Sequence, residues 1–74
     1  MKLRKGMWVV ADDGQVGIIN AMRDGKAEFH RVGAEGLTEI VLLLDPSTLV
    51  QARYREIPES RRPRREVAAA LGYQ

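Results

Sequence analysis

The chain has 74 residues, of which 45% are hydrophobic and 30% charged, a length that predicts one domain and a composition too apolar for general disorder. It contains no cysteine, which excludes disulfides, thiolate nucleophiles and thiolate metal ligands. Its formal net charge of +2 is too small to indicate a nucleic-acid partner by itself.

The stretch MWVVADDGQVGIIN (7–20) predicts a β-hairpin. Asp13-Gly14 between two apolar runs is a strong signal for a two-residue turn, in which both central residues adopt positive φ. Closing the hairpin there places Ala11 opposite Val16, Val9 opposite Ile18 and Met7 opposite Asn20. Both faces of this ribbon are then largely apolar, which favours a strongly curved sheet between two layers over an open sheet with one wet face.

Three further strands are predicted after this hairpin. Asp24-Gly25 predicts a turn that leads into a strand over 26–32. Simple pairing across this turn would put polar Asn20 beside Phe29, so the sequence leaves open whether the loop is longer or a β-bulge changes the register. GAEG (33–36) is a turn, and LTEIVLLL (37–44) is the most apolar strand, broken at Pro46. The last strand, LVQARYREI (49–57), alternates and carries Arg53 and Arg55 on a basic outer face. Five short strands at even spacing predict a small barrel.

The C-terminal segment predicts a short helix. Ser60 is a plausible N-cap, Pro63 fits the first turn, and RREVAAAL (64–71) precedes a terminating Gly72. Val67, Ala70 and Leu71 lie at helical spacing and form its apolar stripe. A helix this short is marginal alone, so it needs to pack either on its own barrel or on a partner.

The first hairpin resembles the KOW motif of small SH3-like barrels, which occur in ribosomal proteins and transcription elongation factors. The resemblance rests on Gly6, Val9, Ala11, Gly14 and Gly17, followed by Ile18-Ile19. It implies a mainly β fold, a small five-stranded SH3-like barrel with a short C-terminal α-helix. Residues 1–58 would form the barrel, and residues 59–74 a basic tail and helix of the same domain.

A second resemblance concerns the segment after the barrel. A short barrel followed by EIPESRRP (56–63) is similar to small uncharacterised proteins encoded in bacteriophage and prophage genomes. This resemblance implies a phage-related assembly role as an alternative function.

The candidate site is a basic surface near the C-terminus. Residues 1–50 carry six Lys/Arg and seven Asp/Glu, whereas residues 51–74 carry six Arg and three Glu. A phosphate-binding surface would use Arg53, Arg55, Arg61, Arg62, Arg64 and Arg65, with Trp8 or Tyr54 stacking on an unpaired base if exposed beside them. The competing interpretation is a solvated tail whose arginines pair with Glu56, Glu59 and Glu66.

The sequence lacks the combinations of residues that enzymes use for catalysis. His30 has no second histidine, cysteine or fixed carboxylate pair beside it, and nothing near Ser47-Thr48 would activate a hydroxyl. Asp12-Asp13 lacks converging ligands for a hard metal, and GAEG lacks the lysine and helix of a phosphate loop. We therefore expect no enzyme, no cofactor, no metal and no small-molecule substrate.

We expect a non-enzymatic binding module whose partner is RNA or DNA. The alternative is a protein-interaction or assembly module that uses strand edges and the C-terminal helix. The N-terminal segment lacks the apolar run of a signal peptide and no stretch has the length of a membrane span, so we expect a cytoplasmic protein with no membrane partner.

Overall fold

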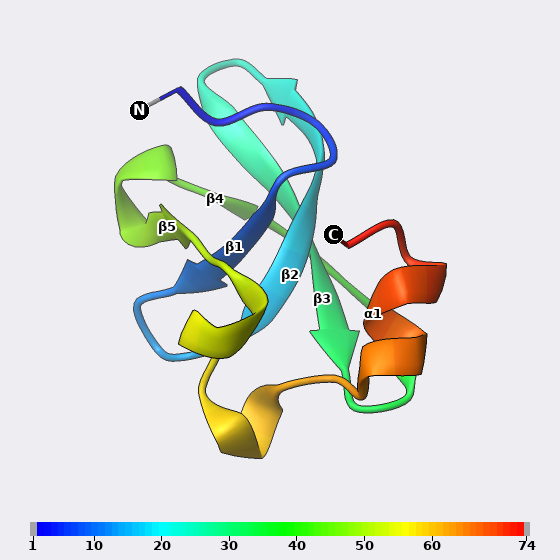
Figure 1. Cartoon of the computed structure of the whole chain (residues 1–74). Helices are drawn as coiled ribbons and strands as arrows, with labels where there is room; N and C mark the ends of the chain where they lie inside the picture. The colour runs from blue at the N-terminus through cyan, green and yellow to red at the C-terminus, as the bar shows by residue number, and fades with distance from the viewer. Residues whose placement is uncertain (1, 74) are drawn as a thin grey trace.

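The computed structural model describes residues 2–73 as a mainly β chain with one short helix (Figure 1). The strands are β1 (Trp8–Ala11), β2 (Val16–Arg23), β3 (Lys26–Gly33), β4 (Gly36–Leu44) and β5 (Leu49–Gln51). They form one antiparallel sheet in the order β4-β3-β2-β1-β5. The predicted mainly β, five-stranded class is confirmed. Within the described residues β4 and β5 are opposite edges, so hydrogen bonds do not close a barrel.

Short 3-10 turns carry the chain from the sheet to the helix. They are η1 (Pro46–Thr48) between β4 and β5, and η2 (Tyr54–Glu56) and η3 (Glu59–Arg61) between β5 and α1 (Arg65–Ala70). Figure 1 shows this C-terminal segment, from yellow to red, wrapping across one side of the sheet. The wrapping brings Tyr73 back to Trp8 of β1.

The first hairpin forms, but its predicted register is wrong by one residue. Val9 pairs with Gly17 and Val10 with Val16, because the loop is Asp12–Gly14 rather than a two-residue turn. The Ala11 amide donates to the Gln15 carbonyl at 2.8 Å, and only Gly14 in this loop has positive φ, at 88°. The longer loop is stabilised because a side-chain oxygen of Asp13 accepts from the Gln15 amide at 3.1 Å.

The second Asp-Gly turn has the predicted two-residue form. Asp24 and Gly25 both adopt positive φ, at 50° and 76°, and Arg23 pairs with Lys26. The open question of register is answered by a bulge between Ile19 and Ala21 of β2. The bulge leaves Asn20 exposed, where its amide donates to Glu28 at 2.9 Å, so the polar side chain avoids the core.

Both faces of the sheet carry a hydrophobic core, as the two apolar faces of the first hairpin predict. One cluster consists of Val9, Ala11, Ile19, Ala27, Phe29 and Leu49. The other consists of Trp8, Val16, Val32, Ala52, Ile57 and Ala68. The second cluster includes residues of the C-terminal segment, so this segment is the layer that covers the second face.

Two tyrosines hold the C-terminal segment against the sheet. The Tyr54 hydroxyl donates to the Pro63 carbonyl at 2.6 Å, and the Tyr73 hydroxyl donates to the Ala52 carbonyl at 3.0 Å. The Tyr73 ring also packs edge-on against Trp8, with ring centroids 4.6 Å apart. The helix therefore leans on its own sheet, the first of the two possibilities left open by the sequence.

The helix begins later than predicted and buries a different side chain. Arg64 is its N-cap, and the predicted cap Ser60 lies inside η3, because the chain stays extended around the buried Pro63. Ala68 is the buried helical residue, whereas Ala70 is exposed, which corrects the predicted stripe. Gly72 ends the helix as predicted, with φ of 88°.

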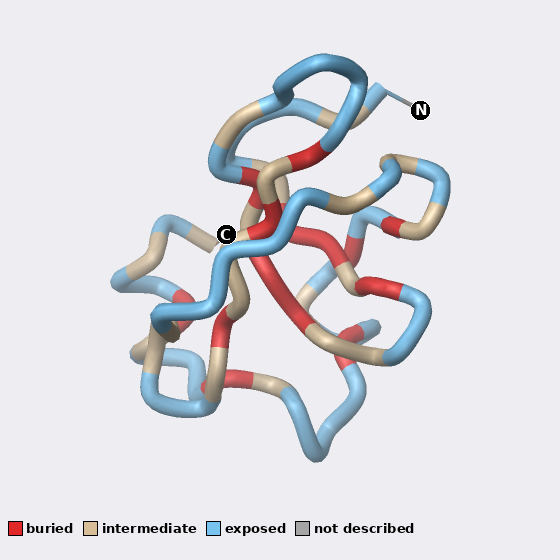
Figure 2. The backbone as a smooth tube through the Cα atoms, turned by 180° about the vertical axis from the view of Figure 1, so that it is seen from behind, coloured by how far each residue is buried: buried red, intermediate tan, exposed pale blue. Residues whose placement is uncertain are grey.

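The β4 strand is the exposed edge of the molecule. It is the most apolar strand, yet Leu37, Ile40, Val41, Leu42 and Leu43 are all exposed, with Leu43 reaching 62%. The view in Figure 2, turned to the other side, shows this strand largely in the colour of exposed residues, in contrast to the buried stretches of β1, β2 and β3. An apolar edge strand is an unusual surface for a monomer.

Candidate nucleic-acid interface

The arginines predicted on a last strand lie instead on a 3-10 turn. β5 ends at Gln51, and Arg53 and Arg55 flank Tyr54 at the start of η2. The strand stops because Glu56 accepts from the Arg53 amide at 2.8 Å, while the Glu56 amide donates to the Arg53 carbonyl at 2.8 Å. These two bonds close a turn, so the prediction of a basic outer strand face is wrong.

The turn nevertheless brings three arginines together with the helix. A groove of about 540 Å³ between η2 and α1 is lined by Arg53, Tyr54, Arg55, Arg65, Ala68, Ala69 and Tyr73. Three of these seven residues are cationic and none is acidic. The groove is of the size that proteins use for ligands, and its charge suits an anion.

The groove arginines have no acidic partner among the described residues. Ion pairs in residues 2–73 involve Arg23 with Glu28, Lys26 with Asp45 and Arg64 with Glu35. Arg53, Arg55 and Arg65 are all exposed and pair with none of the three glutamates of this segment. The ion pairs with Glu56, Glu59 and Glu66 that the competing interpretation expected are therefore not formed by these three arginines.

Tyr54 organises the cations around the groove. The guanidinium carbons of Arg62 and Arg65 lie over its ring at 5.3 Å and 5.1 Å from the centroid. Arg62 also donates to the Ile57 carbonyl at 2.9 Å and to the Arg55 carbonyl at 3.0 Å. Arg62 is thus a structural residue that fixes the backbone carrying Arg55, and Arg65 is held by cation–π attraction at the edge of the groove.

The remaining two arginines lie outside the groove. Arg64 forms an exposed ion pair with Glu35 in the β3–β4 turn, at 2.6 Å. Arg61 lies near Gly14 in the first hairpin loop. Hydrogen bonds from Gln15 are the main cause that lowers the pKa of Asp13, and the charge of Arg61 lowers it further. The structure therefore places three of the six predicted arginines in the groove, keeps Arg62 beside them over Tyr54, and separates Arg61 and Arg64 from them.

Trp8 cannot serve as the predicted stacking residue. Its side chain is only 5% exposed and lies under Tyr73 in the second core. Tyr73 itself lines the groove and was not among the predicted site residues. Its position after Gly72, which reverses the chain at the end of the helix, is the only sequence signal that could have indicated it. Burial is the main cause that raises the Tyr73 pKa above its ordinary value of 10.0.

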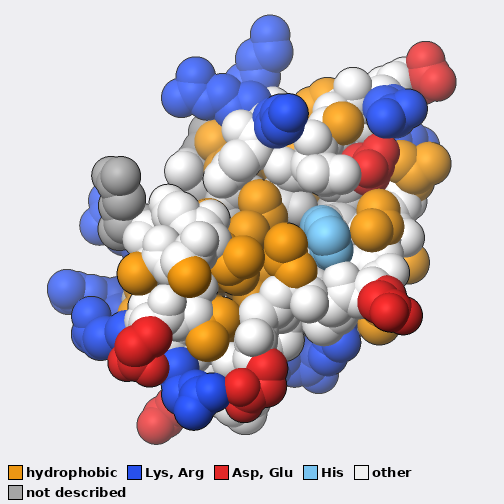
Figure 3. Space-filling model, turned by 90° about the vertical axis from the view of Figure 1, so that its right-hand side faces the viewer, with side chains coloured by type: hydrophobic (Ala, Val, Ile, Leu, Met, Phe, Trp, Pro, Cys, Tyr) orange, Lys and Arg blue, Asp and Glu red, His pale blue; other side chains and the backbone are white. Residues whose placement is uncertain are grey.

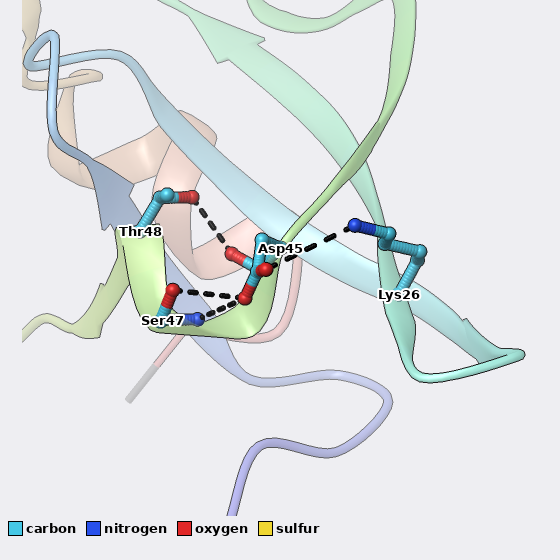
Figure 4. A network of polar contacts seen from close by, with 4 residues as sticks. All are labelled: Lys26, Asp45, Ser47 and Thr48. Carbon is cyan, nitrogen blue, oxygen red and sulfur yellow. Dashed lines mark hydrogen bonds and ion pairs between the residues drawn. The ribbon is translucent and has the colours of Figure 1, made fainter.

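The other polar side chains considered for chemistry have structural partners. His30 donates from Nε2 to the Thr38 carbonyl at 2.7 Å, which stabilises a bulge of β4. The Ser47 hydroxyl donates to a carboxylate oxygen of Asp45 at 2.8 Å, and the Thr48 hydroxyl donates to the Asp45 carbonyl at 2.7 Å. Figure 4 shows this network at the turn after β4, with Lys26 reaching toward Asp45 from β3. Within residues 2–73 there is no cluster of His, Asp or Glu that could hold a metal ion.

A second surface of interest surrounds the exposed strand. Figure 3 shows hydrophobic side chains gathered beside the histidine on one face of the molecule, with charged side chains of both signs around the rim. His30 pairs across the sheet with Val41, which is 46% exposed, and Glu28 pairs with Leu43. The exposed apolar side chains of β4 thus lie beside the polar residues His30 and Glu28 of the neighbouring strand.

Comparisons with known proteins found none that is similar to this chain. No protein-family model, curated protein or solved structure matches this chain. No helix in the described part of the chain is both long and apolar enough to cross a membrane.

Proposed function

We propose that this protein is a non-enzymatic nucleic-acid-binding module that holds phosphates in the groove between η2 and α1. The observation that carries the proposal is the groove lining, in which Arg53, Arg55 and Arg65 converge without an acid. Guanidinium groups donate several hydrogen bonds in a plane and match phosphate oxygens well. The KOW resemblance of the first hairpin supports the same function.

The groove is also held rigidly enough to position these charges. The backbone around Arg55 is tied by Arg62, and Arg65 stands on α1, which the second core anchors through Ala68. A groove whose backbone is already ordered loses less conformational freedom on binding than a flexible basic tail would. RNA and DNA are both within this proposal, because both present the same phosphodiester oxygens.

The direct test is fluorescence anisotropy with labelled DNA and RNA from about 50 to about 200 mM salt. We expect binding that weakens steeply with salt. A variant with Arg53→Gln, Arg55→Gln and Arg65→Gln should bind about tenfold more weakly or worse, because three phosphate contacts are lost. Arg62 is left in place because its loss would disturb the fold.

The matched control removes three charges outside the groove. Arg23→Gln, Lys26→Gln and Arg61→Gln are exposed positions on the second hairpin turn and in η3. We expect the control to keep binding within about threefold, since long-range attraction alone is screened beyond about 10 Å. Absence of binding at low salt by the folded protein, or equal loss in both variants, would sink the proposal.

A second candidate function is association through β4 with a second copy of the chain. It is favoured by five exposed apolar side chains on an edge strand whose one charged residue is Glu39. Antiparallel pairing of β4 with itself is a symmetric contact in which each apolar strand meets an identical one. The opposite edge, β5, is only three residues long and offers little for such pairing.

A further inference from the structure

The aromatic side chains of this protein are all engaged within the fold. The chain has four of them, and Phe29 and Trp8 are 0% and 5% exposed. The Tyr73 ring lies against Trp8 at 4.6 Å and near Tyr54 at 5.9 Å. Two guanidinium groups lie over the Tyr54 ring. A base that stacked in the groove would have to displace one of these partners.

The polar groups of the groove are suited to phosphates rather than to base edges. Arginine only donates hydrogen bonds, and phosphate oxygens only accept them. Recognition of a base needs donors and acceptors placed to match its edge. The groove's other polar groups, the Tyr54 and Tyr73 hydroxyls, already donate to the carbonyls of Pro63 and Ala52.

We infer that the groove binds the phosphodiester backbone of duplex nucleic acid and does not read the unpaired bases of single strands. The inference rests on the proposed function and specifies its ligand. Single-strand binders gain affinity from base stacking on aromatic rings, which this groove does not offer. A duplex presents the denser row of phosphates, about one charge per 1.7 Å of axis, and so gains more from three convergent cations.

Binding through three phosphate contacts predicts how strongly the affinity depends on salt concentration. Three phosphate contacts on a duplex give a slope of log affinity against log salt of about −2.7, so affinity should fall about 40-fold between 50 and 200 mM salt. The same contacts on a single strand give a shallower slope of about −2.1. The triple variant Arg53→Gln, Arg55→Gln and Arg65→Gln should lose most of this dependence.

The experiment compares three probes of about 20 nucleotides, a size that covers a small module. They are a mixed-sequence duplex, its single strand, and an abasic strand that keeps the backbone but has no bases, and the duplex is prepared as DNA and as RNA. We expect the duplex to bind most tightly, and the single strand and the abasic strand to bind with equal affinity. Two duplexes of unrelated sequence should bind alike.

The outcomes separate the inference from the function on which it rests. A single strand that binds as well as the duplex, or about tenfold more tightly than the abasic strand, would show that bases are read and overturn the inference while leaving nucleic-acid binding intact. A preference for one duplex sequence would also overturn it. No binding of any probe at low salt would remove the proposed function itself.

Discussion

At the scale of single residues, Gly17 shows how closely the strands are packed. A Cβ atom at this position would lie 2.5 Å from the Phe29 ring and 2.8 Å from the His30 carbonyl oxygen. The crowding comes from β3, so glycine is the residue that fits at this position of β2.

We expect Gly17→Ala to destabilise the protein by about 2 kcal/mol or more, because a buried ring and a backbone oxygen would have to move. Chemical denaturation measures the loss. Gly33→Ala is the matched control, since its Cβ would meet the Thr38 methyl at 3.3 Å, a contact that a shift of a few tenths of an ångström relieves. Similar stabilities of the two variants would contradict this account of β2 and β3.

Tyr73 makes stability depend on pH at the alkaline end. Burial raises the pKa of Tyr73 in the folded chain, whereas the unfolded chain releases the proton near 10.0. The contribution of Tyr73 to stability is therefore fully present below pH 10 and is lost as pH rises through the folded pKa.

Denaturation midpoints measured through this range should fall for the wild type more steeply than for Tyr73→Phe. The phenylalanine variant should start about 1 kcal/mol lower, because its bond to Ala52 is gone. Parallel profiles for the two proteins would refute this role.

At the scale of elements, local signals and tertiary contacts each decide part of the structure. Asp24-Gly25 specifies its turn because both residues adopt positive φ, and Gly72 ends the helix because it also adopts positive φ. The last strand forms but is shorter than predicted, because β5 ends at Gln51 instead of continuing to residue 57. The Glu56 carboxylate decides for the turn by capping Arg53. No pattern in the sequence shows that bond.

The helix α1 provides a test of the second core. Ala68→Asp should destabilise the protein by about 3 kcal/mol or more, since Ala68 is only 2% exposed and a buried unpaired charge is costly. Ala70→Asp places the same charge two residues away on an exposed position and should cost no more than about 1 kcal/mol. Thermal melts of both variants measure these two losses of stability. Equal melting temperatures would mean that the helix does not cover the sheet.

At the scale of the whole molecule, the exposed edge strand β4 carries the second candidate function. We expect the wild type to dimerise through β4, and Val41→Lys with Leu43→Lys to be monomeric, because charges at an edge strand oppose pairing. Val50→Lys changes an even more exposed apolar residue, at 69%, on the opposite edge and should leave the dimer intact. Analytical ultracentrifugation over a dilution series measures all three proteins. A monomeric wild type, or a dimer that survives the double substitution, would exclude this interface.

The sequence by itself determined the mainly β class, the number of strands, the positions of the turns and the presence of a C-terminal helix. Those features depend on neighbouring residues, since turn chemistry and strand alternation act over a few positions. Only the tertiary structure decided that Trp8 is buried, that Arg53, Arg55 and Arg65 share a groove while Arg61 and Arg64 do not, and that the most apolar strand lies at an edge. Each of these depends on which surfaces the folded chain brings together, and contacts between distant residues are not encoded in any local pattern.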